Sequence, residues 1–591
     1  MSSKTADRIQ IALAQHRAGR LVQAEAIYRQ ILTDDPKHAE TLNRLGVLAM
    51  QTGRLEVAVK SIARAIAIDP SSADYPCNLG EALRRLGRPS DAISAFEEAI
   101  RLNPDLAVAH NNLGITLAES GQIEEAILSY MRAIQLKPDY AEAYNNLGNA
   151  LTQIDRFDEA FAQFNAAIRL QFNYAQAHNN LGVALAKDYR FNAAIDSYQR
   201  AIHLKPDYDE AYSNLGNALA ATGNADDALT ACRRAVQLNP NSVGAHWNLA
   251  VILLRQGHFE HGLPAYEWRW KSPTAPRTFR QPQWTGENLT GKTILLHAEQ
   301  GFGDTIQFVR YAPIIAAAGA RVILECQSEL LRLLKGIAGI DETIERGQPL
   351  PDFDCHCPLM SLPLVFKTRL ETIPSTVPYL HADPGTSLHW KNKILNHAGF
   401  GGTPTTRISI DKNPGRRSTH SKSSPSTGSG QAGQASEPGV ATAMPPQNIG
   451  LAWAGNPTHS DDRNRSIKLS ELSPLARPGL KFHSLQKGDR SSETPPDGMN
   501  WTDHTAQLTD FADTAACISN LDLVITVDTA VAHLAAAMGK PVWLLLAFLP
   551  DWRWLMGRDD SPWYPTMRLF RQPSAGDWAT PIRRVVEMLG R

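Results

Sequence analysis

Residues 107–140 read AVAHNNLGITLAESGQIEEAILSYMRAIQLKPDY, and the same order of residue types returns every 34 residues along the first half of the chain. Leucine followed by glycine recurs in this register at Leu45-Gly46, Leu79-Gly80, Leu113-Gly114, Leu147-Gly148, Leu181-Gly182 and Leu215-Gly216. A small residue lets two helices approach closely, a further glycine turns the chain between them, and a proline ends the second helix. The spacing therefore predicts pairs of helices that bury their apolar faces only by stacking on neighbouring pairs.

This pattern resembles the tetratricopeptide repeat. Seven units extend to about residue 240, and a divergent eighth comes next as SVGAHWNLAVILLRQGHFEHGLPAYEWRW, residues 242–270. We expect the aromatic residues of this last unit to cap the array and to dock it onto the second half of the chain. The resemblance implies an α-helical superhelix with a concave groove, which we assign to residues 1–274.

An asparagine directly precedes the leucine position in six of the units. These residues are Asn78, Asn112, Asn146, Asn180, Asn214 and Asn248. A side-chain amide both donates and accepts hydrogen bonds, so a row of amides can hold an extended peptide regardless of its sequence. Alternatively, each amide bonds the neighbouring repeat and stiffens the superhelix. The residues alone favour neither interpretation.

Composition excludes several classes of protein. The 59 Lys and Arg residues nearly balance the 60 Asp and Glu residues, which argues against a general nucleic-acid or membrane-surface binder. Six cysteines in 591 residues do not form a disulfide framework, and Cys355, His356 and Cys357 lack a second ligand pair at zinc spacing. The first 20 residues lack the apolar core of a signal peptide, and no run of about 20 apolar residues predicts a membrane span. We therefore expect a cytoplasmic protein without a bound metal.

A low-complexity stretch divides the second half of the chain. It includes GRRSTHSKSSPSTGSGQAGQASEPGVATAMPPQ, which is rich in Gly, Ser, Thr and Pro. Such a composition buries too little apolar area to offset the entropy lost on ordering. We predict a disordered linker over residues 391–447.

Alternating strands and helices are predicted on both sides of this linker. Before it, TILLHAE and RVILECQ have the composition of buried strands; after it, NIGLAWAG, KFHSLQ, LDLVITV and PVWLLL do. Amphipathic helical segments separate them, which is typical of parallel α/β lobes. We expect one lobe over residues 285–390 and another over 448–591, with ligands bound at the carboxyl ends of the strands.

The first candidate site is AEQGFGDT, residues 298–305, where an apolar strand meets a glycine-rich turn. Gly301 and Gly303 permit a tight turn and the close approach of a ligand. Asp304 could cap the following helix, help to hold a phosphate, or accept a proton. A third glycine and a suitably placed acid are not evident, so this is not a dinucleotide-binding fingerprint.

The second candidate site is DTAVAH, which comes directly after another apolar strand. Its helix start offers free N–H groups to a diphosphate, and the residues concerned are Asp528, Thr529, Ala530 and His533. Asp528 is more simply a helix cap, and His533 could equally be a packed core residue. Two further strand-end loops supply candidate ligands for the same cleft, namely Asn456, Arg465, Gln486 and Lys487.

The motifs GFGDT, LAWAGNP, DRNRSI, LQKG and DTAVAHLAAAMGKPVWLLL together resemble the heptosyltransferase-like glycosyltransferases of family 9, which have the two-lobed GT-B fold. The layout, repeats followed by such lobes, is similar to that of protein O-GlcNAc transferases. The resemblance implies that Asp304 is the general base and that the carboxy-terminal lobe binds the nucleotide sugar. Arg465 stands where that family has a cation near the donor phosphates. The tryptophan-rich PDWRWLMGRDDSPWYP is unlike the family, which puts a lipopolysaccharide acceptor in doubt.

The resemblance implies an inverting transferase that needs no metal or cofactor and uses a nucleotide sugar as its donor. It also favours a protein or peptide acceptor held by the asparagine row. Two alternatives remain: a repeat scaffold whose transferase lobes are inactive, and a transferase acting on a glycan or a lipid-linked acceptor.

Overall fold

The computed structural model describes residues 3–271, 279–396, 447–459 and 462–590, which form two compact units, Met1–Leu253 and Leu254–Arg591. Most of the predicted linker, residues 397–446, lies outside this described part. No helix among the described residues is long and apolar enough to cross a membrane.

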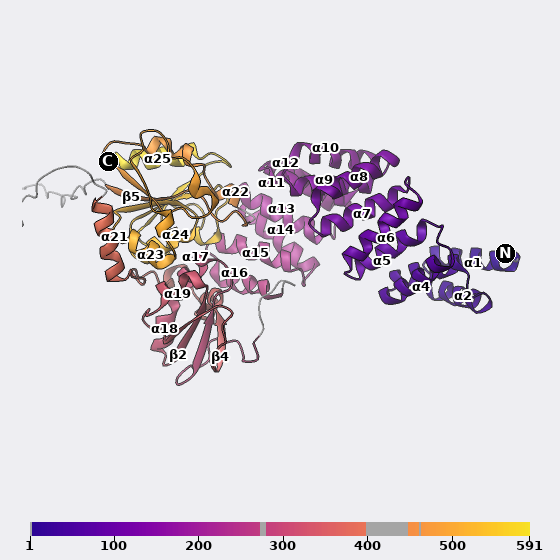
Figure 1. The fold of residues 1–591 in the computed structure, drawn as a ribbon, viewed down its shortest axis with the longest axis horizontal. Coiled ribbons are helices and arrows are strands. Elements are labelled where there is room, and N and C mark those ends of the chain that lie inside the picture. Colours follow the sequence, from indigo (N-terminus) through magenta and orange to yellow (C-terminus); the bar gives the residue numbers. More distant parts are fainter. Residues whose placement is uncertain (1–2, 272–278, 397–446, 460–461, 591) are drawn as a thin grey trace, which may run out of the picture. The chain divides into compact units, whose positions relative to one another are not determined.

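The first unit consists of stacked antiparallel helix pairs, coloured indigo to magenta in Figure 1. Its helices are α1 (Ser3–Arg17), α2 (Leu21–Asp34), α3 (Ala39–Gln51), α4 (Leu55–Ile68), α5 (Asp74–Arg85), α6 (Pro89–Leu102), α7 (Ala107–Glu119), α8 (Ile123–Leu136), α9 (Ala141–Gln153), α10 (Phe157–Leu170), α11 (Ala175–Lys187), α12 (Phe191–Leu204), α13 (Asp209–Ala221), α14 (Ala225–Leu238) and most of α15 (Val243–Arg255). The predicted repeat superhelix is therefore confirmed.

The repeated glycine explains how tightly each pair packs. A side chain on Gly148 of α9 would place its Cβ 2.7 Å from the ring of Phe164 on α10. The missing side chain thus makes room for a fully buried aromatic ring from the partner helix. The turn between paired helices needs a positive φ, which Gly121 adopts at 81° and Asp155 adopts at 58° where the expected glycine is absent.

The second unit begins with α16 (Phe259–Tyr266) and the 3-10 helix η1 (Glu267–Lys271). The two units divide after Leu253, whereas the repeat array was predicted to extend to residue 274. The side chain of Phe259 stacks on Trp563 at 6.1 Å, and Tyr266 contacts Trp552 at 5.9 Å between ring centroids. These aromatic contacts account for the position of α16 in the second unit.

The first α/β lobe contains a four-stranded parallel sheet in the order β3-β2-β1-β4. Its strands are β1 (Thr293–His297), β2 (Arg321–Cys326), β3 (Glu342–Glu345) and β4 (Cys355–Pro358). Its helices are α17 (Phe302–Phe308), η2 (Val309–Tyr311), α18 (Ala312–Ala317), α19 (Ser328–Leu334), η3 (Leu359–Ser361), α20 (Leu362–Val365) and η4 (Leu370–Thr372). Asp304 lies on α17, shortly after the carboxyl end of β1.

The second lobe contains a six-stranded parallel sheet in the order β10-β9-β8-β5-β6-β7. Its strands are β5 (Asn448–Ala452), β6 (Lys481–Ser484), β7 (Trp501–Asp503), β8 (Leu523–Val527), β9 (Val542–Leu546) and β10 (Met567–Arg571). Its helices are α22 (Asp462–Arg465), η5 (Leu469–Leu475), η6 (Asp489–Ser492), η7 (Thr505–Gln507), α23 (Phe511–Ile518), α24 (Ala530–Ala537), η8 (Trp552–Trp554) and α25 (Ala579–Leu589). β8 is buried along its whole length, as its apolar sequence predicts.

Helix α21 (Pro384–Asn396) extends past residue 391, where the linker was predicted to begin. Its residue Ser387 is hydrogen-bonded to Ser519 of the second lobe at 2.6 Å, and the amide of Asn520 donates to the Ser387 carbonyl at 2.9 Å. Helix α21 therefore comes after the first lobe in sequence but packs on the second.

Candidate active site

Asp304 is held by contacts from two lobes. One carboxylate oxygen, Oδ2, accepts the backbone N–H of Gly301 at 3.0 Å, so Asp304 does cap the start of α17. The other oxygen, Oδ1, accepts Nη2 of Arg553 at 2.5 Å. Arg553 lies on η8 of the second lobe, and its guanidinium also pairs with Asp551 at 2.8 Å. The acid that comes after the glycine turn is thus part of a charged cluster between the lobes.

Gly303 packs against the protein, while its expected role in the approach of a ligand stays a prediction. A side chain at this position would place its Cβ 2.8 Å from Cδ2 of His533. His533 is 5% exposed, and its Nδ1 shares a hydrogen bond with the Tyr564 hydroxyl at 3.0 Å. His533 is therefore the packed histidine that the sequence left as an alternative. At Gly301, the nearest atom to an added Cβ is a carboxylate oxygen of Asp304 at 3.6 Å.

Asp528 does not cap α24, although a cap was the simpler expectation. Thr529 occupies the N-cap position, Ala530 begins the helix, and Asp528 accepts the indole N–H of Trp554 at 2.8 Å. The Thr529 hydroxyl is 3.1 Å from that of Thr526. The carboxylate is consequently fixed at the carboxyl end of β8, beside the start of the next helix.

Arg465 lies at the end of α22, and its charge opposes the rise that burial causes in the pKa of Asp528. Its Nε is 3.5 Å from Oδ1 of Asp462, and its side chain is 20% exposed. The Arg465 guanidinium lies against Gly455: a Cβ added to Gly455 would be 2.8 Å from the nearest guanidinium nitrogen. The expected cation and the acid of the second motif therefore share one electrostatic environment.

The other three predicted ligands are occupied by contacts within the protein. Gln486 accepts the backbone N–H groups of Trp453 and Ala454 at 3.0 and 2.9 Å, and its amide donates to two backbone carbonyls. Lys487 donates to the carbonyls of residues 505 and 508 at 3.0 and 2.7 Å. Asn456 accepts the N–H and hydroxyl of Thr458. These side chains stabilise strand-end loops, and their expected role in the cleft stays a prediction.

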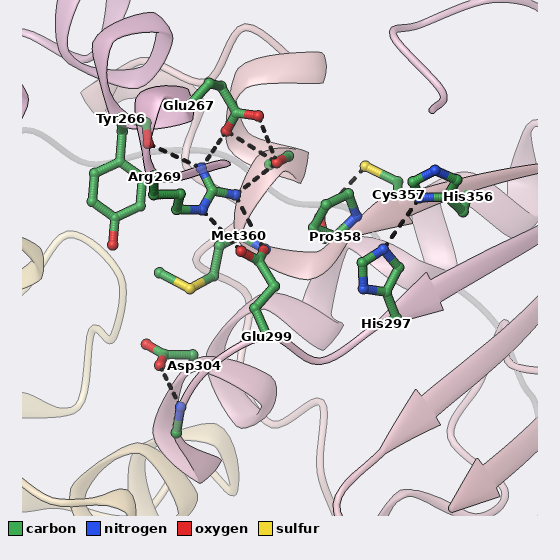
Figure 2. Close-up of polar contacts among 12 residues, drawn as sticks. Tyr266, Glu267, Arg269, His297, Glu299, Asp304, His356, Cys357, Pro358 and Met360 are labelled. Atoms are coloured by element: carbon green, nitrogen blue, oxygen red, sulfur yellow. Dashed lines mark hydrogen bonds and ion pairs between the residues drawn. The ribbon is translucent and has the colours of Figure 1, made fainter. Parts of the chain in front are cut away.

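A buried ion pair fixes the strand-end segment that precedes Asp304. Figure 2 shows Arg269 of η1 between the carboxylates of Glu267 and Glu299. The Arg269–Glu299 distance is 2.8 Å, and their side chains are 7% and 3% exposed. Arg269 also donates to the Ser361 hydroxyl, and Glu299 accepts the Met360 N–H. Glu299 is two residues before Gly301, so this network anchors the loop that leads into α17 and Asp304.

Burial and charge determine the ionisation of the cluster. Burial raises the pKa of Asp304, an effect that Arg553 opposes. Burial and the charge of Asp551 raise the pKa of Asp528 to about 6. Burial lowers the pKa of His533 to about 3, so this imidazole is neutral near pH 7. Burial also acts to raise the pKa of Asp551, but Arg553 outweighs it and holds that pKa low.

The two cysteines flanking His356 are buried on β4, and His356 instead contacts His297 across the sheet. The ring nitrogens are 3.2 Å apart. Within the described ranges, no group of three or more His, Cys, Asp or Glu residues is arranged to hold a metal ion.

In the first unit, the asparagine row bonds one repeat to the next. The Nδ2 groups of Asn78, Asn146, Asn180 and Asn214 donate to the asparagine 35 residues earlier at 3.0–3.1 Å, and Asn248 donates to Ser213. The residue 35 positions before Asn112 is Cys77, which has no amide oxygen to accept this hydrogen bond. The structural interpretation of the row is therefore confirmed, while peptide binding stays a prediction.

Sequence reasoning missed Arg553, Asp551 and Trp554. All three belong to PDWRWLMGRDDSPWYP, the stretch that stood apart because it is unlike the resembled family. An arginine two residues after an aspartate, inside an aromatic run, is the signal that could have found them. Arg553 lies over the rings of Trp552 and Phe308, at 4.7 and 5.5 Å from their centroids.

Known protein families match both the repeats and part of the second lobe. Tetratricopeptide-repeat families match residues 15–75 and, in successive segments, residues 80–188 and 190–257. Glycosyltransferase family 9 (heptosyltransferase) matches residues 499–546, which include β8 and the start of α24. The match supports a glycosyltransferase.

Protein FlbA of Caulobacter vibrioides is 27% identical over 353 residues, which cover 56% of this chain and 52% of FlbA. The chain thus spans about half the length of this curated relative.

Solved structures are similar to the repeats. A crystal structure of MamA protein is 30% identical and covers 30% of this chain and 96% of its own, with a TM-score of 0.26. YrrB, described as a TPR protein with an unusual peptide-binding site, is 24% identical and covers 31% of this chain and 95% of its own, with a TM-score of 0.27. The chain therefore carries tetratricopeptide repeats across its N-terminal half, followed by parallel α/β lobes that include a match to glycosyltransferase family 9.

Proposed function

We propose that the second unit transfers a sugar from a nucleotide-sugar donor to an acceptor hydroxyl, with inversion at the anomeric carbon and without a metal or cofactor. One observation carries the proposal. The acid after β1, Asp304, lies in the same charged cluster as Asp528 at the end of β8, within the segment that family 9 matches. This brings a candidate base from one lobe next to a candidate donor site from the other, as in a GT-B arrangement.

In this mechanism Asp304 removes the proton of the acceptor hydroxyl as its oxygen attacks the anomeric carbon. Each oxygen of Asp304 already accepts one hydrogen bond, from Gly301 and from Arg553, and a carboxylate oxygen has a second lone pair to offer. The leaving diphosphate is placed at the start of α24, where Thr529 and Ala530 supply free backbone N–H groups, with Arg465 as the nearby cation.

The repeats supply the acceptor site in this proposal, and the acceptor is a protein segment. Each bonded asparagine uses one N–H of its amide for the neighbouring repeat, so a second N–H and a lone pair of the carbonyl oxygen can still pair with a peptide backbone. The hydrogen bonds between consecutive repeats support this role, because they hold the amides of the asparagine row at regular positions. A glycan or lipid-linked acceptor would leave the row with its structural role alone.

Donor binding can be tested with a panel of nucleotide sugars and the full chain, using the thermal unfolding midpoint as the readout. A ligand at 100 times its Kd stabilises the folded state by about 2.7 kcal/mol, so a true donor should raise the midpoint by several degrees. The corresponding free sugar serves as the control and should leave the midpoint unchanged. If no nucleotide sugar raises the midpoint, the proposal is wrong.

The acceptor can be tested by transfer of labelled sugar to peptides. Asn180→Asp keeps the size and the carbonyl oxygens but removes the amide donors, whereas Asn112→Asp makes the same change where the inter-repeat bond is not formed. We expect both variants to reduce transfer to a peptide while leaving donor hydrolysis unchanged. Equal transfer by the wild type and both variants would exclude the groove as the acceptor site.

A further inference from the structure

Arg553 connects a carboxylate of one lobe with a carboxylate of the other. Its Nη2 is 2.5 Å from Oδ1 of Asp304, and its Nη1 is 2.8 Å from Oδ1 of Asp551. The backbone N–H of Arg553 donates to the same Asp551 oxygen at 2.9 Å. The Arg553 and Asp304 side chains are 7% and 19% exposed, so their ion pair forms largely away from solvent, whereas the Asp551 side chain is 39% exposed. Two acids thus share one cation at the site of the candidate base.

Aromatic packing holds the guanidinium in place. It lies over the rings of Trp552 and Phe308, and Trp552 in turn contacts Phe259 and Tyr266 of α16. An arginine fixed in this way pairs with carboxylates in a defined geometry, which a flexible lysine at the surface would not do. The orientation of Asp304 is therefore set from both sides, by Arg553 and by the N–H of Gly301.

We propose that Arg553 is the positioning residue for Asp304: it keeps this carboxylate ionised and oriented toward the acceptor, while Asp551 limits how strongly it does so. The proposal rests on the proposed function for its catalytic meaning, because Asp304 is the base only if the unit transfers a sugar. The ion pair itself is independent of that activity.

Charge balance gives the expected direction of each change. Burial raises the pKa of Asp304, and Arg553 opposes this effect, so removal of the guanidinium should raise that pKa further. Asp551 repels a second negative charge, so neutralising it should lower the pKa of Asp304. The other charged or titratable groups near the cluster include His459, Asp528, Arg465, His533, Tyr266, Arg255 and Arg310. None of these is changed by the two substitutions.

A direct measurement follows the ionisation of Asp304 without any substrate. Full-length protein labelled with ¹³C at the aspartate carboxyl carbons is titrated by NMR, and subtraction of the Asp304→Asn spectrum identifies the Asp304 signal. Arg553→Gln should weaken the acidity of Asp304 at least tenfold, and Asp551→Asn should strengthen it. Arg553→Lys retains the charge and should restore most of the acidity. Titration of Asp304 at the same pH in wild type and Arg553→Gln would overturn the proposal, as would a shift of the wrong sign in Asp551→Asn.

A kinetic measurement distinguishes positioning from donor binding. With a donor that is turned over, the acid limb of the pH profile of kcat/KM should move to higher pH in Arg553→Gln, while KM for the donor stays within twofold. A large rise in donor KM with an unmoved acid limb would assign Arg553 to the donor phosphates and overturn the proposal. If the wild type turns over no nucleotide sugar, the proposed function fails, but the NMR titration still decides whether Arg553 controls Asp304.

Discussion

At the scale of single residues, the packing of Gly303 against His533 explains why a glycine is needed directly before Asp304. The residue is helical, without a positive φ, and an added Cβ would lie 2.8 Å from the buried ring of His533. Its absent side chain is therefore a packing requirement between α17 and α24, two helices from different lobes.

Gly303→Ala should destabilise the second unit by about 1–3 kcal/mol, because the His533 ring is enclosed and cannot move away freely. In a His533→Ala background the same substitution should cost much less, since the atoms that it meets are gone. Unfolding monitored by tryptophan fluorescence measures both, because Trp247 is the only one of 12 tryptophans that precedes residue 254. Equal costs in the two backgrounds would show that the contact is not the cause.

His533 should make the second unit less stable as the pH falls. The folded state keeps its imidazole neutral down to a pKa of about 3, whereas the unfolded chain takes up a proton near pH 6.5. The unfolded state therefore binds more protons between these values, so this contribution is complete above pH 6.5 and decreases below it. At pH 5 the loss should reach about 2 kcal/mol relative to pH 7.

The comparison variant for this pH effect is His533→Asn, which can keep a hydrogen bond to Tyr564 but does not titrate. Denaturant unfolding at pH 5, 6 and 7 should show a steeper loss of stability in the wild type than in the variant. Parallel pH dependences would mean that His533 is protonated in the folded protein.

Asp304 could be found from sequence, whereas its partner could not. The acid comes after an apolar strand and a glycine turn, a local pattern that fixes its place at a strand end. Arg553 reaches it from 249 residues further along the chain and from the other lobe. No local pattern reports such a contact. The same reason explains Gln486 and Lys487, whose partners are backbone groups brought close by the fold.

At the scale of the elements, the asparagine row behaves as a set of hydrogen bonds between consecutive helix pairs. Cys77 interrupts this set, because it is buried at the position that Asn43, Asn111, Asn145 and Asn179 occupy in other repeats and has no amide oxygen. An asparagine side chain fits that position in four other units, so a substitution at residue 77 can supply the missing hydrogen-bond acceptor.

Cys77→Asn should stabilise the repeat unit by about 1 kcal/mol, because its carbonyl oxygen can accept the amide of Asn112. Circular dichroism at 222 nm during heating measures the change. The gain should disappear when Asn112→Ala is added, since the new acceptor then has no donor. A gain that survives Asn112→Ala would come from another cause, and no gain would show that the row adds little stability.

The buried ion pair of η1 allows a second test at this scale. Arg269→Met should destabilise the second unit by about 3–5 kcal/mol, because it leaves Glu299 and Glu267 without their buried cation. The matched control is Arg321→Met, which breaks an ion pair with Glu342 of similar length, 2.7 Å, whose side chains are 48% and 41% exposed. The control should cost at most about 1 kcal/mol. Similar costs for the two substitutions would contradict a special role for Arg269.

Strong periodicity and long apolar runs predicted most of the elements. The repeat helices and the strands β1, β2, β5, β6, β8 and β9 were all recognised from them. The short strands β3 and β7 stayed unrecognised, because their residues are only partly buried at the sheet edges and carry charges, as in ETIE and WTD. β4 was missed because CHCP is too short to show an alternation.

At the scale of the whole molecule, the chain joins a regular repeat unit to a unit with two parallel sheets. The two lobes of the second unit are linked by side chains as well as by the chain. Arg310 of the first lobe donates to the carbonyl of Trp563 in the second at 2.7 Å, and Arg332 pairs with Asp510 at 2.7 Å. The charged cluster around Asp304 is one of these contacts between the lobes. Its residues come from both lobes, so the cluster forms only when both lobes are folded.

Removal of the acceptor proton by Asp304 is the central step of the proposed sugar transfer. Its most direct test is the rate of nucleoside diphosphate release by the full chain, measured with saturating nucleotide sugar for the wild type, Asp304→Asn and Asp383→Asn. Asp383 is a matched control because it is an acid at another helix start, where it accepts the Thr386 N–H at 2.7 Å. Loss of a general base costs about 10²–10⁴-fold, so Asp304→Asn should be slower by that factor while Asp383→Asn equals the wild type. Equal rates for all three proteins, or no release by the wild type with any donor, would contradict this role for Asp304.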